Sequence, residues 1–166
     1  MNKLPRVLID IAKIVHNYRK INDQCIHAGV TLTGVVKGVA GDGRIIGALI
    51  EAGLIEIGDS RLENLAKIKT GREVHKMLLR LPALSRMTEV VQYSDISLNT
   101  ESAVLETLNQ SAGNHQVFLM VDLGDRREGV LEEELLKLAS QCLKLKNIHL
   151  QGLGTNFSCF AGVMPS

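Results

Sequence analysis

The stretch "LTGVVKGVAGDGR" (residues 32–44) is the key to the fold. Its apolar, β-branched residues predict a strand over 32–37 that ends on Lys37. Glycines follow at once, and "GRIIGALIEAG" (43–53) then shows the apolar spacing of a helix. Valines before and after Lys37 predict a low dielectric around its amine, where a charge is costly. The stretch therefore predicts one strand–turn–helix unit with a lysine at the turn.

The same unit recurs along the chain. Further apolar runs predict strands at 54–58, 75–80, 95–98, 115–123 and 147–154. Helical patterns lie between them at 61–71, 84–93, 100–113 and 132–145, and an earlier helix begins after Asp10, which is placed to cap it. Such alternation predicts an α/β fold with parallel strands and right-handed crossovers.

Two α/β architectures fit six such units, a doubly wound open sheet and a (β/α)8 barrel of the TIM type. A barrel needs eight strands and about 250 residues. The chain has 166 residues, so as a barrel it would supply about six of the eight units. In that case we expect a truncated chain whose residues 1–166 form a single partial domain.

Composition excludes several classes of function. The net charge of +1 and the aromatic content of 3% argue against a nucleic-acid partner. The apolar N-terminal stretch is broken by Asp10 and Lys13, so we expect neither a signal peptide nor a membrane span. Three scattered cysteines form no C-x-x-C pair and the histidines lack a second ligand, which favours a cytoplasmic protein without a metal site.

Polar residues follow every predicted strand. They are Lys37, 58–64, Arg80, Asn99, 121–129 and 154–158. The carboxyl ends of parallel strands lie on one side of the sheet, where α/β enzymes build their active sites. The pattern predicts a site at this edge.

Lys37 has two interpretations from position alone. A lysine among apolar side chains favours the neutral amine, which attacks carbonyl groups and forms Schiff bases. Alternatively its stem packs while the ammonium reaches water, paired with Asp42. The flanking residues leave both open.

Two further motifs invite competing interpretations. "GDGRIIG" (41–47) with Asp59 partly matches a dinucleotide fingerprint, and would make the protein a nucleotide-dependent oxidoreductase using Gly41, Gly43 and Asp59. Its third glycine is one place late, which favours a plain glycine-rich turn. In "VDLGDRREGV" (121–130) the arginines suit a carboxylate or phosphate, or the charges pair among themselves in a solvated loop.

Taken together, "IDIAKIVHNYRKI", "VVKG", "IEIGDSRLENLAKI", "VDLGDRREGV" and "GLGTNFS" resemble the N-terminal barrel domain of the alanine racemase family. These are pyridoxal 5'-phosphate enzymes of fold type III, and the likeness is greatest to the ornithine-racemase-like members. The resemblance implies that Lys37 forms the Schiff base with the cofactor and acts as one of two bases. It also implies that Arg127, Asn156 and Ser158 lie near the cofactor.

The chain departs from the family pattern at two positions. Asn156 stands where alanine racemases have a histidine, and Gly41 stands where they have a phosphate-contacting tyrosine. We therefore expect a substrate other than alanine, such as ornithine or another diamino acid. Asp42, Asp59 and Asp125 are candidate partners for its basic side chain.

The resemblance also implies parts that these 166 residues lack. The family's opposing tyrosine base belongs to a C-terminal β-domain, which we expect to be absent here. Racemisation needs a proton transfer on each face of the α-carbon, so we expect the chain alone to be catalytically incomplete and the intact enzyme to be a homodimer or another homo-oligomer. The main rival is a small barrel protein of pyridoxal-phosphate homeostasis, which binds the cofactor without turnover.

Overall fold

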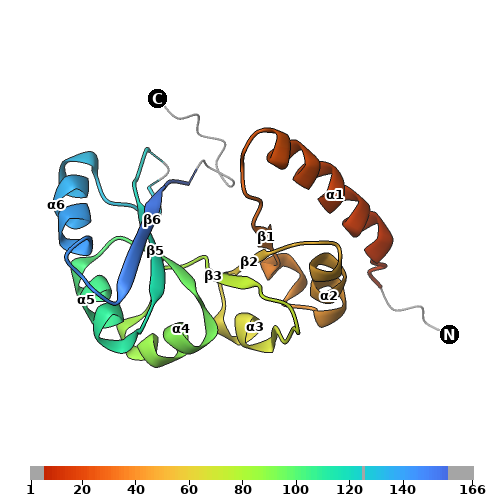
Figure 1. Ribbon diagram of the computed structural model, residues 1–166, viewed down its shortest axis with the longest axis horizontal. Helices are drawn as coiled ribbons and strands as arrows, with labels where there is room; N and C mark the ends of the chain where they lie inside the picture. Colours follow the sequence, from red (N-terminus) through yellow and green to blue (C-terminus); the bar gives the residue numbers. More distant parts are fainter. Residues whose placement is uncertain (1–5, 125, 157–166) are drawn as a thin grey trace.

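Asp10 starts the first helix, as its position predicts. In the computed structural model, which describes residues 6–124 and 126–156, its Oδ1 accepts a hydrogen bond from the backbone N–H of Lys13 at 3.1 Å. The side chain thereby satisfies one of the free N–H groups of the first turn of α1 (Ile11–His27). Figure 1 shows this long helix at one end of the molecule, beside α2.

The predicted alternation of strands and helices is confirmed. The strands are β1 (Gly34–Val35), β2 (Glu56–Asp59), β3 (His75–Leu78), β4 (Ile96–Asn99), β5 (His115–Met120) and β6 (Ile148–Gly154). The helices after α1 are α2 (Gly43–Glu51), α3 (Leu62–Lys67), α4 (Met87–Tyr93), α5 (Ser102–Ser111) and α6 (Glu132–Cys142), with 3-10 turns η1 (Lys37–Val39) and η2 (Leu84–Arg86).

The order of the strands decides between the two architectures. All six strands are parallel and lie in chain order, β1 to β6, in one sheet. A doubly wound sheet reverses its order at a switch point, and this sheet does not, so that alternative is wrong. The arrangement is that of six consecutive units of a (β/α)8 barrel, with α2 to α6 along one side of the curved sheet (Figure 1).

Alternate strand residues face the helices and form the core with them. Ile57, Val117 and Leu119 are completely buried between the sheet and the helix layer. In-register pairing sets Asp59, Leu78, Ser97 and Val117 side by side across four strands on this same face. Polar residues in this row are consequently enclosed by the helices.

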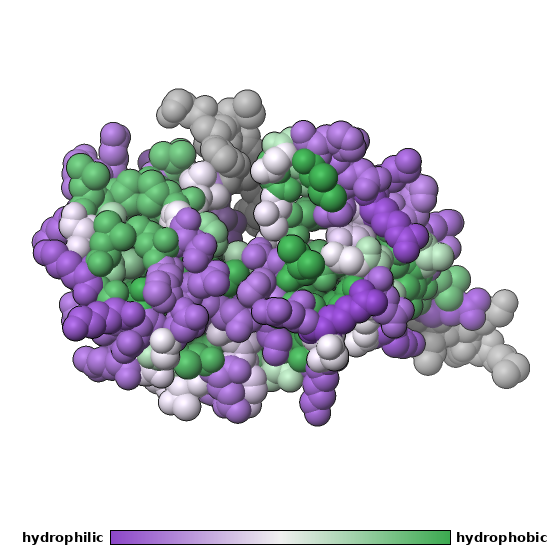
Figure 2. Space-filling view, viewed as in Figure 1, coloured by the Kyte–Doolittle hydropathy of each residue, from purple (hydrophilic) through white to green (hydrophobic). Residues whose placement is uncertain are grey.

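Apolar side chains are exposed at both edges of the sheet. Val35 on β1 is 53% exposed and Leu153 on β6 is 56% exposed. Leu136 on α6 and Leu143, the residue directly after this helix, lie seven positions apart and are also exposed, and Figure 2 shows apolar side chains gathered on the side of the molecule that holds α6. Val35 and Leu153 are exposed because β1 and β6 are the two edge strands of the described sheet.

Candidate active site

Lys37 lies directly beyond β1, on the turn η1, which it begins. Its side chain is exposed, and its Nζ has no hydrogen bond or ion pair to any residue that the structure describes. The predicted low dielectric is therefore wrong for this structure. Val36 is buried, but Val35 is half exposed because β1 is an edge strand. The amine is left accessible at the carboxyl edge of the sheet.

Asp42 caps α2 and does not pair with Lys37. Its Oδ1 accepts hydrogen bonds from the backbone N–H of Arg44 at 3.0 Å and of Ile45 at 3.4 Å. Its Oδ2 lies 2.8 Å from Nη2 of Arg44. These interactions, the Arg44 side chain foremost, lower the pKa of Asp42 to about 2. The Asp42 carboxylate, which was predicted to contact the substrate, is therefore already engaged at the start of α2.

Gly41 is required by the packing of the turn. Its φ is +70°, and a Cβ at this position would lie 3.1 Å from the Cβ of Asn64, in the helix that follows β2. Both the left-handed backbone and the close approach exclude a bulky side chain such as tyrosine. The backbone conformation of this loop therefore explains why glycine stands where the family has a tyrosine.

Asp59 faces the helix layer and is completely buried. Its Oδ1 accepts from the backbone N–H of Arg61 at 2.9 Å, and its Oδ2 accepts from Nδ2 of Asn64 at 3.0 Å. Both oxygens therefore fix the start of α3. This arrangement argues against contact with a substrate or with the ribose of a dinucleotide.

The motif after β5 folds back on the strand end. Asp122 Oδ1 accepts hydrogen bonds from the backbone N–H of Gly124 and of Arg126, at 2.9 and 3.0 Å. Gly124 has a φ of +105°, and a Cβ on Gly129 would overlap the backbone nitrogen of Asp122. Val130 then donates to the Met120 carbonyl at 2.8 Å. Asp122, Gly124, Gly129 and Val130 thus shape the loop that carries the arginines.

Arg127 and Asn156, which the resemblance places near the cofactor, both contact the carboxylate of Glu128. Nδ2 of Asn156, beyond β6, donates to Oε2 of Glu128 at 3.3 Å. The same oxygen lies 3.5 Å from Nη2 of Arg127. The structure therefore brings Arg127 and Asn156 together through Glu128. Ser158 and Asp125 lie outside the described residues.

A buried polar chain on the helix side of the sheet was missed from the sequence. His115 Nε2 lies 3.0 Å from Oγ of Ser97, which also accepts from Nδ2 of Asn99 at 3.1 Å. His115 begins β5 and is only 2% exposed. Burial lowers its pKa to about 4, against smaller opposing effects of Asp95 and of the Ser94 backbone. The period-two spacing of Ser97 and Asn99 was the available signal.

Two absences apply to the described part of the chain. Residues 6–124 and 126–156 contain no cluster of three or more histidine, cysteine, aspartate or glutamate side chains placed to hold a metal ion. Among the same residues no helix has the length and apolarity needed to cross a membrane.

A family model described as "Alanine racemase, N-terminal domain" matches residues 9–164. The chain belongs to this family. The resemblance seen in the sequence is thereby confirmed, and the dinucleotide-dependent oxidoreductase is excluded as an interpretation.

Curated relatives and a solved structure agree with this membership. The chain is 39% identical to an ornithine racemase of Acetoanaerobium sticklandii over 97% of its length, and 34% identical to a lysine racemase of Thermotoga maritima over 98%. It spans about half of each relative, 47% and 46%. An alanine racemase of Bartonella henselae, solved with covalently bound pyridoxal phosphate, shares the fold with a TM-score of 0.73 and 24% identity. That match covers 91% of this chain and 46% of the other.

Proposed function

We propose that residues 1–166 form the pyridoxal-phosphate-binding barrel domain of an amino-acid racemase that acts on a diamino acid. The observation that carries the proposal is the accessible Lys37 amine beyond the first strand of a family member. An amine that is not held in an ion pair is suited to covalent attachment of an aldehyde.

The residues present fit the cofactor. Lys37 would hold it covalently, and Arg127 and Asn156 would contact it from the neighbouring ends of β5 and β6, kept in place by Glu128. The hydroxyl Oγ1 of Thr155, beside Asn156, is buried and has no hydrogen-bond partner within residues 6–124 and 126–156, so it is a further group able to meet a ligand. Ser158 remains a candidate from the resemblance alone.

When bound, pyridoxal phosphate supplies an electron sink that stabilises negative charge on the substrate α-carbon. Lys37 Nζ would hold or deliver the proton on one face of that carbon. Inversion also needs a base on the opposite face, and none of the residues assigned here supplies it. We therefore expect the chain to bind the cofactor and to racemise nothing by itself.

A diamino acid is the substrate class that the relatives favour, because the two curated matches are named for ornithine and lysine. The Asp42 carboxylate caps α2 and the Asp59 carboxylate holds a buried turn, so neither is proposed to bind the substrate. Asp125 remains the candidate for the distal ammonium. Asp125→Ala in the intact enzyme should then raise the KM for diamino acids more than that for alanine.

Cofactor trapping tests the proposal directly. Pyridoxal phosphate is added to the purified chain, the product is reduced with borohydride, and the modified lysine is mapped by peptide mass spectrometry. We expect the label on Lys37 and its loss in Lys37→Ala, while Lys69→Ala, which removes another exposed lysine, keeps it. Labelling spread over surface lysines would overturn the assignment.

Turnover separates the racemase from the homeostasis protein. An intact protein that binds the cofactor through Lys37 but leaves L-ornithine and L-lysine optically unchanged would be the non-catalytic binder. Full racemase activity of the 166-residue chain would contradict its expected incompleteness.

We also propose a cytoplasmic location and a homodimer or another homo-oligomer. The scattered cysteines of the sequence, which form no C-x-x-C pair, support the first, and the exposed Leu136 and Leu143 support the second. Light scattering after size-exclusion chromatography measures the assembly, and fractionation of cells measures the location.

A further inference from the structure

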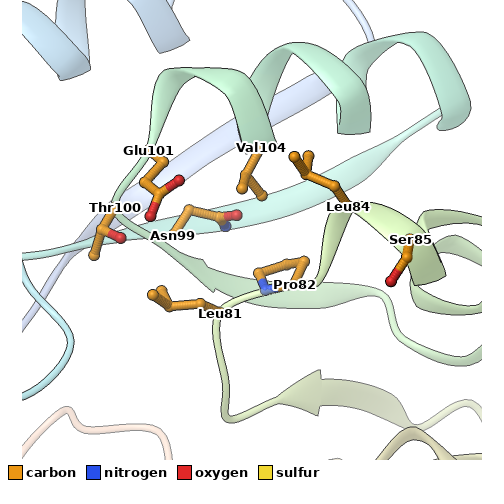
Figure 3. Close-up of a pocket in the computed structure, with 8 residues that line it drawn as sticks. All are labelled: Leu81, Pro82, Leu84, Ser85, Asn99, Thr100, Glu101 and Val104. Atoms are coloured by element: carbon orange, nitrogen blue, oxygen red, sulfur yellow. The ribbon is translucent and has the colours of Figure 1, made fainter.

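A pocket of about 410 Å³ lies away from Lys37, between the loop after β3 and the start of α5. Figure 3 shows the residues that line it. Its apolar walls are Leu81, Pro82, Leu84 and Val104. A pocket with these walls suits an aliphatic chain.

Asn99 supplies an unpartnered acceptor to this pocket. The residue ends β4 and is completely buried, and its Oδ1 has no hydrogen-bond partner among the residues that the structure describes. In Figure 3 the amide end points toward the space between Val104 and Pro82. A buried acceptor without a donor is costly, so a ligand that brings a donor would gain by binding here.

The orientation of the Asn99 amide is fixed by its neighbours. Nδ2 donates to the backbone carbonyl of Ser97 at 3.0 Å, and a carbonyl only accepts. Ser97 Oγ accepts from the same Nδ2 at 3.1 Å and lies 3.0 Å from Nε2 of His115. An inverted amide would set oxygen against oxygen at the Ser97 carbonyl. The oxygen of Asn99 must therefore be the atom that faces the pocket.

The other polar side chains that line the pocket are either negatively charged or uncharged. Glu101 lines the pocket and is exposed, and its carboxylate has no hydrogen bond or ion pair with the part of the chain that the structure describes. Ser85 and Thr100 add hydroxyl groups, and none of the eight lining residues is basic. An unpaired carboxylate and an unpaired amide oxygen together favour a cationic donor.

We propose that this pocket binds a primary aliphatic ammonium group, as carried by an alkylamine, a diamine or a diamino acid side chain. The ammonium donates to Asn99 Oδ1 and lies near the Glu101 carboxylate, and the alkyl chain packs on Leu84 and Val104. The site is distinct from that of Lys37. Three strand spacings of about 4.8 Å separate β1 from β4, or about 14 Å, and Asn99 faces the helix layer.

Binding of n-butylammonium to the chain tests the proposal, without pyridoxal phosphate, whose aldehyde reacts with amines. Methyl NMR of the pocket leucines is expected to report saturable binding with a Kd on the order of 1 mM, typical of a ligand of five heavy atoms. The neutral n-butanol and the anionic butyrate should bind at least about tenfold more weakly. Equal binding of n-butanol would overturn the proposal and leave an apolar pocket whose Asn99 is satisfied by water.

Three variants make the test specific. Glu101→Gln should weaken n-butylammonium about fivefold to tenfold, while Glu106→Gln, an exposed glutamate of the same helix outside the pocket, should leave it unchanged. Leu84→Lys, at a half-exposed position, should fill the pocket with a tethered ammonium and abolish binding. Unchanged affinity in Glu101→Gln and Leu84→Lys would place the ligand elsewhere.

The proposal stands or falls separately from the assignment of Lys37. Lys37→Ala should abolish cofactor trapping and retain n-butylammonium binding at this pocket. Loss of n-butylammonium binding in Lys37→Ala would instead show that the amine occupies the cofactor site and would overturn the second site. Comparison of 1,5-diaminopentane with L-ornithine then tells whether a diamine or an amino acid is preferred.

Discussion

Asn156 and Glu128 join two loops that lie far apart in the sequence. Nδ2 of Asn156, beyond β6, donates to Oε2 of Glu128 at 3.3 Å, and the same oxygen meets Nη2 of Arg127 at 3.5 Å. One carboxylate therefore positions both residues that are proposed to contact the cofactor.

Glu128→Ala should weaken cofactor binding although Glu128 itself need not touch the cofactor. Without the carboxylate, Asn156 loses its partner and Arg127 loses an ion-pair contact, so both sample more orientations. We expect the Kd for pyridoxal phosphate to rise about fivefold, measured by titration of the visible absorbance band.

Two controls identify the cause. Glu128→Gln keeps an acceptor for Asn156 and should fall between the wild type and Glu128→Ala. Glu133→Ala, an exposed residue in the first turn of α6, should change nothing. An unaltered Kd in Glu128→Ala would show that the contact has no positioning role.

Gly129→Ala should destabilise the fold. A Cβ at Gly129 would overlap the backbone nitrogen of Asp122 and lie 2.6 Å from the carbonyl carbon of Val121, and neither backbone atom is free to move away. We expect a loss of about 2–3 kcal/mol in the free energy of unfolding, measured by urea denaturation. Gly113→Ala is the matched control, because a Cβ there meets open space. Equal stability of the two variants would refute this account of the motif.

Asp42→Ala should lower the urea midpoint, whereas Asp42→Asn should retain most of it, since asparagine also caps helices. Because the folded pKa of Asp42 is lowered to about 2, its contribution is present above the ordinary carboxylate pKa and is lost as the pH falls toward 2. If Asp42 caps α2 and does not bind the substrate, the affinity of the intact enzyme for diamino acids should be unchanged in Asp42→Asn. Selective loss of that affinity with a normal midpoint would restore the substrate assignment.

His115 should make the fold less stable in mild acid. Burial holds its folded pKa near 4, below the ordinary 6.5, so between these values the unfolded chain binds more protons. Stability should therefore fall as the pH drops from about 6.5 to about 4, by up to about 3 kcal/mol. His115→Gln removes the titrating group and should flatten the dependence in this window. A profile that remains as steep in His115→Gln would assign the effect to other groups.

The sequence by itself determined the elements and the place of the lysine. Apolar period and glycine-rich turns are local properties, so they predicted all six strands, the helices between them and the cap at Asp10. Even so, β1 is shorter than predicted, since Val36 leaves the extended conformation with φ −107° and ψ 6°. The family motifs, which are also read along the chain, pointed to a cofactor lysine at position 37.

Tertiary structure alone decided which residues meet. Strand order separated the barrel from the doubly wound sheet, because both have the same alternation along the chain. Burial under the helices turned Asp59 from a candidate ligand group into a fixed turn. The pairs Asn156–Glu128 and His115–Ser97 join residues 28 and 18 positions apart. No local period encodes such contacts, since they depend on how neighbouring strands and loops are set against one another.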